Sequence, residues 1–211
     1  MSGRADELIV LCPLGVEALS VRTGLRGGRV VRAGVRARRR DAVLAALHAR
    51  PGVPVAVAGV AAALTECARP GDLVVPDVVC SADRVWRCPS AGTLSAVLRG
   101  DHRVRTAVHT GALIESPRMV RHVREVRGGR SAVALDMESG LLLDLADDGR
   151  KVAVLRAVVD TPERPLLSAA TVAGGVAALA ALRACGPALR TWAATVARGK
   201  NDSVVKEVRH P

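Results

Sequence analysis

The stretch AVALDMESG, residues 132–140, places two carboxylic acids, Asp136 and Glu138, directly after four apolar residues. An apolar run of this kind is typical of a buried strand, and the LLLDLA that follows is typical of a helix. Ligands of open α/β sheets bind beyond the carboxyl ends of the strands, so these acids stand where chemistry is expected. The alternative is structural: Asp136 caps the helix, and Glu138 interacts with the positive end of its dipole. This stretch alone leaves both interpretations open.

Two further acids stand at the ends of predicted strands. Glu17 follows the apolar run LIVLC in the loop CPLGVE, and Asp160 ends the run VAVLRAVVD. Gly59 ends a third run, VPVAVAG, where a missing side chain lets a ligand or the backbone approach closely. The loops after successive strands meet at one edge of such a sheet, so these residues are expected near Glu138.

Strands and helices alternate along the predicted chain. Short, Val-rich runs that end in Gly, Pro or Asp predict strands at 8–12, 30–34, 53–59, 72–76, 105–111, 132–136 and 152–160. Helical patterns follow at 36–49, 116–126 and 138–146, and a long Ala- and Leu-rich segment covers 166–197. This order predicts an α/β protein, a three-layer α/β/α sandwich around a central, largely parallel mixed sheet.

The composition allows a sizeable core, because 49% of the 211 residues are hydrophobic. We predict a single domain over residues 1–211, with the core at about 7–198 and mobile tails at 1–6 and 199–211. The absence of a long apolar run and of a signal-peptide core favours a cytoplasmic protein. The five cysteines lack CxxC spacing, so we predict free thiols and no metal site.

The formal net charge of +11 raises the question of an anionic partner. Nucleic-acid binding favours aromatic side chains among the basic ones, and this chain has no Phe, no Tyr and two Trp. We therefore predict no specific nucleic-acid partner. Attraction to an anionic membrane surface remains open, as does a simple compositional bias toward arginine.

The ordered set of strand ends resembles the nucleoside phosphorylase and nucleosidase superfamily, whose hydrolytic branch includes the methylthioadenosine/S-adenosylhomocysteine nucleosidases. In that family one strand ends in (V/D)-M-E-(S/A/G) and a later one in S/A/V-D; here these are DMES, residues 136–139, and RAVVD, residues 156–160. The segment 55–76 resembles the family's glycine-and-alanine loop and GD(L/I)V strand. The resemblance extends from Leu8 to about Ala197.

The resemblance implies a role for each matched residue. Asp160 matches the acid that protonates the departing purine at N7, for which a raised pKa is suited. Glu138 matches the carboxylate that accepts both ribose hydroxyls, and Met137 packs on the sugar; Asp136 then serves the turn. Gly59 and Ala61 belong to the substrate-binding loop. Met119 and Val120 stand where the family stacks the purine, with Met119 in place of the usual Phe.

Glu17 matches the acid that takes a proton from the attacking water in the hydrolytic branch. Phosphorylases instead offer arginines to a phosphate, including one just before the glycine of the third strand, where this chain has Ala58. Arg36 and Arg38 could reach an anion, but they more simply begin an exposed basic helix. The resemblance therefore implies hydrolysis, with no cofactor and with phosphorolysis as the alternative.

The missing aromatics favour an unusual 5′ group on the substrate. A short branch of the family, the hopanoid-associated nucleosidase that removes adenine from adenosylhopane, has a similar first loop ending in E-x-x-x-(L/V)-R, here residues 17–22. The alternatives are an ordinary methylthioadenosine/S-adenosylhomocysteine nucleosidase, a purine nucleoside phosphorylase, and a non-catalytic nucleoside-binding module. Family members are dimers or hexamers, so the resemblance implies a homo-oligomer.

Overall fold

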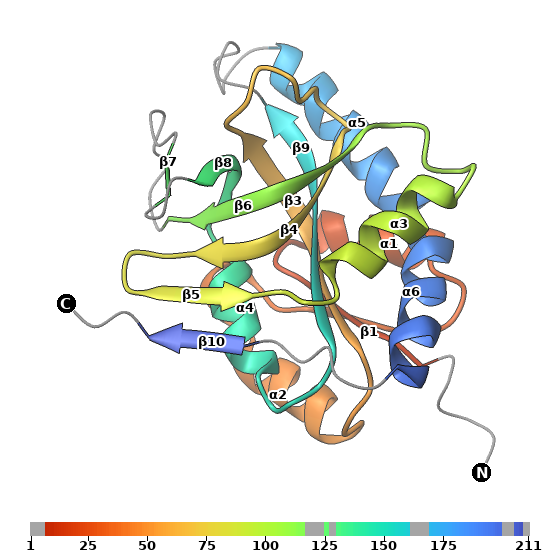
Figure 1. The fold of residues 1–211 in the computed structure, drawn as a ribbon. Helices are drawn as coiled ribbons and strands as arrows, with labels where there is room; N and C mark the ends of the chain where they lie inside the picture. Colours follow the sequence, from red (N-terminus) through yellow and green to blue (C-terminus); the bar gives the residue numbers. More distant parts are fainter. Residues whose placement is uncertain (1–6, 117–124, 127–129, 161–168, 200–204, 209–211) are drawn as a thin grey trace.

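A central sheet runs through the computed structural model, which describes residues 7–116, 125–126, 130–160, 169–199 and 205–208 (Figure 1). Its strands are β1 (Ile9–Cys12), β2 (Arg29–Arg32), β3 (Val55–Ala63), β4 (Leu73–Cys80), β5 (Arg84–Arg87), β6 (Val108–Glu115), β7 (Glu125–Val126), β8 (Arg130–Asp136), β9 (Val152–Asp160) and β10 (Val205–Val208). The order is β10-β5-β4-β6-β8-β3-β1-β2, and β9 pairs with both β3 and β4.

The sheet is mixed, with parallel pairing between most of its central strands. β1 is parallel to β2 and β3, β3 to β9, and β6 to β4 and β8. The antiparallel pairs are β3 with β8, β4 with β9 and β5, β5 with β10, and β7 with β8. Because β3 pairs with both β8 and β9, the carboxyl ends of β8 and β9 lie beside the same strand.

The helices lie on both sides of this sheet. They are α1 (Gly15–Gly24), α2 (Arg40–His48), α3 (Ala91–Gly100), α4 (Ser139–Ala146), α5 (Ala169–Ala184) and α6 (Gly186–Arg198), with a 3-10 turn η1 (Val35–Ala37). α1 contacts α5 and α6, and α3 contacts α6, whereas α2 contacts α4 (Figure 1). The predicted α/β/α architecture with a largely parallel sheet is confirmed.

Small aliphatic side chains fill the space between the layers. β1 and most of β3 and β9 are buried, so these central strands are covered on both faces, as continuous apolar runs predict. The two tryptophans, Trp86 and Trp192, are the largest fully buried side chains.

Several predicted boundaries are wrong. β3 continues through Gly59 to Ala63, because this glycine makes room for other side chains rather than ending the strand. The predicted helix 36–49 starts only at Arg40, since Arg36 and Ala37 have left-handed φ values of 53° and 48°. The segment 166–197 contains two helices that meet at Cys185.

Several elements were not predicted at all. One is α1, so Glu17 lies in the first turn of this helix and not in a loop. β5, α3 and β10 were missed, and β10 lies within the predicted tail 199–211 and pairs with β5. The predicted helix 116–126 lies largely outside the described residues, and its last two residues form β7, antiparallel to β8.

Within the described segments, no single helix is long and apolar enough to cross a membrane; only the bent pair Val172–Ala184 and Gly186–Arg198 meets the length and composition together.

Candidate active site

A cavity of about 220 Å³ opens where β3, β8 and β9 end and α1 begins. It contains the three acids that the sequence singled out, Glu17, Glu138 and Asp160. Its remaining described lining is mostly aliphatic: Pro13, Leu14, Val35, Val60, Ala61, Ala62, Leu135, Asp136, Met137, Arg156 and Val159. Tertiary structure thus brings together acids that lie more than a hundred residues apart in the sequence.

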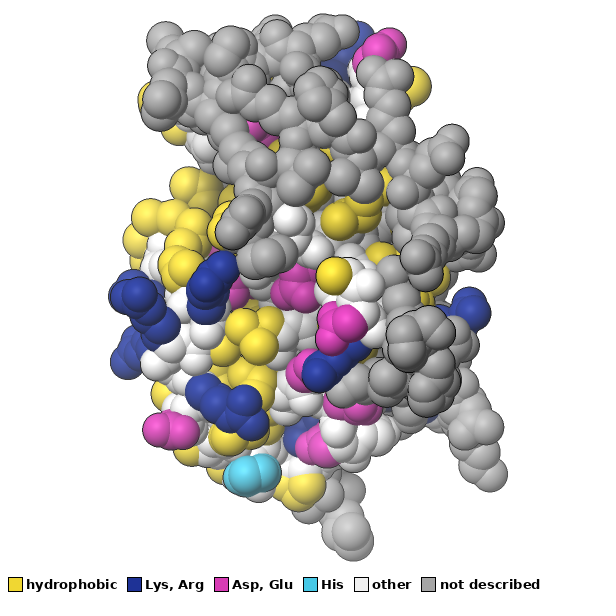
Figure 2. All heavy atoms as spheres, turned by 90° about the vertical axis from the view of Figure 1, so that its left-hand side faces the viewer, with side chains coloured by type: hydrophobic (Ala, Val, Ile, Leu, Met, Phe, Trp, Pro, Cys, Tyr) yellow, Lys and Arg dark blue, Asp and Glu magenta, His cyan; other side chains and the backbone are white. Residues whose placement is uncertain are grey.

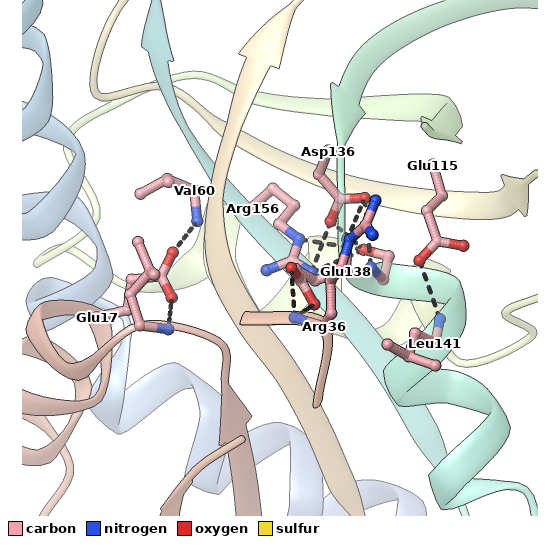
Figure 3. Close-up of polar contacts among 10 residues, drawn as sticks. Glu17, Arg36, Val60, Glu115, Asp136, Glu138, Leu141 and Arg156 are labelled. Carbon is pink, nitrogen blue, oxygen red and sulfur yellow. Dashed lines mark hydrogen bonds and ion pairs between the residues drawn. The ribbon is translucent and has the colours of Figure 1, made fainter. Parts of the chain in front are cut away.

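Glu17 is held rigidly at the start of α1. Its side chain is 2% exposed, and its Oε2 accepts a hydrogen bond from the Leu14 backbone N–H at 2.7 Å. Oε1 accepts from the Val60 N–H of β3 at 2.9 Å (Figure 3). Burial raises the pKa of this carboxyl group, and the nearby Arg156 opposes the rise. An acid whose pKa is raised toward neutrality is suited to exchange protons with water.

Asp136 serves the turn before α4, as predicted. Its carboxylate accepts hydrogen bonds from the Ser139 N–H at 3.3 Å and from the Ser139 hydroxyl at 2.6 Å. It also forms an ion pair of 2.6 Å with Arg156, whose side chain is 1% exposed. Arg156 donates to the Ser139 hydroxyl from Nε at 3.1 Å and from Nη2 at 2.9 Å. These contacts hold the end of β8 against β9.

Sequence reasoning missed Arg156, although the signal was present. It is the one charged residue inside the apolar run VAVLRAVV, and an arginine in a buried strand requires buried partners. Its neighbour across the sheet is Gly59 of β3. A Cβ atom at Gly59 would collide with Nη1 of Arg156 and would lie 2.9 Å from Oε1 of Glu17. Gly59 therefore leaves room for the side chains of Arg156 and Glu17, and it is not among the residues that line the cavity.

Glu138 is anchored by the backbone of a distant loop. Both of its carboxylate oxygens accept a hydrogen bond from the Arg36 N–H, at 2.9 and 2.8 Å (Figure 3). The left-handed conformation of Arg36 and Ala37, which is strained for residues other than glycine, belongs to this anchoring loop. Burial raises the pKa of Glu138, and the Arg36 N–H opposes the rise. A carboxylate has about four lone-pair positions, so Glu138 can still accept from two further hydroxyls.

Asp160 differs from the other acids in what holds its carboxyl group. Among the described residues, its buried Oδ1 has no hydrogen-bond partner, and the residue is 7% exposed. Burial raises the pKa of this carboxyl group, and its own backbone N–H is the opposing influence. No cation among the described residues contributes to this shift. A buried acid in such surroundings tends to hold its proton, which is what a proton donor requires.

A fourth acid, Glu115, was given no role by the sequence analysis. It ends β6 beside Asp136 of β8, and its Oε1 accepts a hydrogen bond from the Leu141 N–H at 3.0 Å. Burial is the main cause that raises its pKa. Glu115 therefore caps the first turn of α4 and adds negative charge beside Asp136. Figure 2 shows the face that lies on the left in Figure 1, with acidic side chains near its middle and basic ones beside them.

Of the remaining predicted site residues, two line the cavity and two are not described by the structure. Met137 and Ala61 line the cavity. Met119 and Val120 lie outside the described residues. No group of His, Cys, Asp or Glu in the described part of the chain is arranged to hold a metal ion.

The fold of this chain is similar to those of several solved structures. The 5′-methylthioadenosine/S-adenosylhomocysteine nucleosidase from Neisseria meningitidis, in complex with methylthio-immucillin-A, matches with a TM-score of 0.67 at 13% identity, over 90% of this chain and 98% of that one. The same enzyme from Helicobacter pylori matches with a TM-score of 0.67 at 14% identity, over 90% and 98%. A mutant futalosine hydrolase from H. pylori matches with a TM-score of 0.59 at 14% identity, over 84% and 96%.

The chain therefore has the nucleosidase fold, and the predicted resemblance to the nucleoside phosphorylase and nucleosidase superfamily is confirmed at the level of the fold. No protein-family model and no curated protein matches the sequence itself.

Proposed function

We propose that this protein is a nucleosidase that hydrolyses the N-glycosidic bond of a purine nucleoside, with adenine as the released base. The observation that carries the proposal is the cavity that contains Glu17 at the start of α1, Glu138 directly before α4 and Asp160 at the end of β9. The acids have different surroundings, and each suits a different task in breaking a C–N bond.

In the proposed reaction, Asp160 donates its proton to the departing base as the sugar gains oxocarbenium character. Glu138, held by Arg36, accepts the two ribose hydroxyls, and its negative charge stabilises the cationic sugar. Glu17 takes a proton from the water that attacks the anomeric carbon, while two backbone N–H groups fix its orientation. The products are the free sugar and the neutral base, which carries the proton from Asp160. Glu17 then releases to solvent the proton that it took from water, and Asp160 regains one from solvent.

Water is favoured over phosphate as the nucleophile. Arg156 is the one cation among the described lining residues, and it already pairs with Asp136 and Ser139. A phosphate dianion would lie near Glu17 and Glu138, and the described lining offers no free guanidinium to neutralise it. Phosphorolysis therefore remains the less favoured alternative.

The substrate we propose carries an apolar 5′ group, as in adenosylhopane. The aliphatic lining residues Leu14, Val35 and Met137 support this choice, as does the absence of Phe and Tyr from the chain. Each methylene buried from water contributes about 0.8 kcal/mol, so a long hydrocarbon would gain several kcal/mol of binding. A methylthioadenosine-type substrate is the alternative.

The test is release of free base from a series of adenosine derivatives in phosphate-free buffer, followed by chromatography. We expect adenine and the free sugar, with a higher kcat/KM for a long 5′ hydrocarbon than for methylthioadenosine. A strict phosphate requirement with a sugar 1-phosphate product would replace hydrolysis by phosphorolysis. Binding of nucleosides without any turnover would favour a non-catalytic module.

We also propose that the protein forms a homo-oligomer. Val16 and Leu19 of α1 are 55% and 58% exposed, and Val172 and Val176 of the neighbouring α5 are 71% and 65% exposed. Exposed apolar side chains on adjacent helices favour burial against a second copy. Sedimentation equilibrium tests this proposal, and a monomer at micromolar concentration would refute it.

Peripheral contact with an anionic membrane is proposed on the net charge of +11 and on the apolar substrate. We expect anionic vesicles to retain the protein at low salt and to release it at high salt.

A further inference from the structure

A second and larger hollow, of about 550 Å³, lies along the outer edge of the sheet. Strand β2 is the last strand in the described sheet, and the hollow lies over this strand and beside α1 and α2. Half of its lining residues are arginines. We call this hollow the arginine hollow and define it by Arg22, Arg29, Arg32, Arg39 and Arg50, with Leu25, Gly28, Val30, Val31 and Ala42.

The charge of the arginine hollow is largely uncompensated. No acid belongs to its lining, and of its five arginines only Arg50 has an ion pair with a described residue, Glu7, at 3.9 Å. That pair is weak, because the two side chains are 39% and 42% exposed. Several like charges around one hollow repel each other, and a bound anion removes that repulsion.

The backbone of β2 adds further donors. Arg29 donates its N–H to Leu8 at 2.7 Å, and Ala33 donates to Cys12 at 2.8 Å, both toward β1. N–H groups alternate between the two sides of a strand, so those of Val30 and Arg32 point away from β1, at the outer edge of the sheet. Both residues also line the arginine hollow, so guanidinium groups and outward N–H groups lie at the same edge.

We propose that the arginine hollow binds a small ligand that carries two or more closely spaced phosphate groups. Guanidinium groups bind phosphate oxygens in a two-pronged geometry, and a single phosphate would engage only some of the five. The volume lies within the roughly 300–1,000 Å³ of small-molecule sites. The two tryptophans are 2% and 0% exposed, so neither indole ring is available to stack the bases of a nucleic acid.

This site is separate from the proposed active site, because the two hollows share no lining residue. It is also distinct from the simplest structural role of arginines on an edge strand, which is to prevent that edge from pairing with another chain. Edge protection requires charge alone, whereas a site requires saturable binding that depends on these particular arginines.

The experiment titrates orthophosphate, pyrophosphate and tripolyphosphate into the full chain by calorimetry. The site variant is Arg29→Gln/Arg32→Gln, and the matched control is Arg183→Gln/Arg198→Gln, which removes the same charge from exposed positions on α5 and α6. Base release is measured in both variants, and we expect it to be unchanged, since neither pair belongs to the active site.

We expect saturable binding of one tripolyphosphate, tighter than pyrophosphate and much tighter than orthophosphate. Affinity should fall at least about tenfold in the site variant, as expected when charge-assisted hydrogen bonds are lost, and change by less than about twofold in the control. Equal losses in both variants would attribute binding to net charge and overturn the proposal, as would titrations that do not saturate.

Closely spaced phosphates could also come from lipid headgroups, and a vesicle arm separates the two sources. Phosphatidylcholine vesicles with and without phosphatidylglycerol are sedimented with each variant, with and without tripolyphosphate. A soluble ligand is supported if the site variant still sediments with anionic vesicles as the wild type does. The proposal of a soluble ligand would be overturned if only the site variant no longer sedimented with anionic vesicles and the wild type did not bind tripolyphosphate. The arginine hollow would then be a membrane-binding surface.

Discussion

Asp160 and Glu17 are both buried acids in one cavity, but they differ in what holds them. Two backbone N–H groups fix Glu17, whereas Oδ1 of Asp160 has no partner among the described residues. Hydrogen bonds from N–H groups favour the ionised form of an acid, and burial favours the protonated form. Two N–H groups of other residues oppose the effect of burial at Glu17, whereas at Asp160 the opposing N–H is its own. The pair therefore has the asymmetry that a base and an acid require.

Replacing the proposed proton donor tests this assignment. Asp160→Asn should lower kcat for base release by a factor of about 100 to 10,000, because general acid catalysis is lost. Nucleoside binding and the unfolding midpoint should stay close to wild type. Wild-type turnover in this variant, measured by adenine release, would remove Asp160 from the mechanism.

The pH profile tests the base. The rate should rise with pH as Glu17 loses its proton and fall again as Asp160 loses the proton that it donates, so kcat/KM should be bell-shaped. Burial raises the pKa of both groups, which places both limbs above the ordinary values of 4.5 and 3.8. The residual rate of Glu17→Gln should lack the rising limb; persistence of that limb would assign it to another group.

At the scale of elements, β3 and β9 pair so that the side chain of Arg156 occupies the space where a residue other than Gly59 would have its Cβ atom. Gly59→Ala would place a methyl group against Arg156 and Glu17, and the overpacking should cost about 1–3 kcal/mol of unfolding free energy. Base release should fall as well, since Glu17 is displaced. Urea unfolding and the activity assay measure the two effects.

A matched control exists on α5. A Cβ atom at Gly175 would lie in open space, with no heavy atom of another segment within 4 Å, so Gly175→Ala should stabilise the helix by about 0.5–1 kcal/mol. Equal stability of the two alanine variants would show that β3 and β9 separate easily and that Gly59 is not required by packing.

At the scale of the whole molecule, four acids, three of them buried and Glu115 half-buried, affect stability in the same direction. Burial raises the pKa of Glu17, Glu115, Glu138 and Asp160, so the folded chain binds more protons than the unfolded chain above their ordinary values of 4.5 and 3.8. Their contribution to stability is full below those values and is lost as pH rises through the folded pKa values. Asp148, whose pKa Arg150 lowers, acts in the opposite direction but only below 3.8.

The free energy of unfolding should therefore fall between about pH 5 and about pH 7. Glu115→Gln should make this slope shallower, because it removes a half-buried acid of raised pKa that is outside the proposed mechanism. Asp41→Asn, at an exposed position on α2, should leave the slope unchanged. Urea titrations at both pH values provide the measurement, and equal slopes in the wild type and Glu115→Gln would contradict the argument.

The amino-acid sequence by itself determined the elements whose pattern is local. β9 spans residues 152–160 as predicted, and α4 starts within one residue of its predicted position. A continuous apolar run needs no distant partner to be recognised, and the acids at its end mark the edge of the sheet. For the same reason Asp136 was correctly assigned to the turn, since its partner Ser139 is only three residues away.

Only the tertiary structure decided what surrounds each acid. Glu138 is held by Arg36, 102 residues away, and Glu17 by Val60 of β3. Gly59 resembles a strand end in the sequence, but it lies inside β3 because Arg156 of β9 needs its space. Such contacts depend on strand register and on close approach between distant segments, and neither leaves a period or a spacing along the chain. The sequence placed the acids at one edge of the sheet, and packing gave each its own environment.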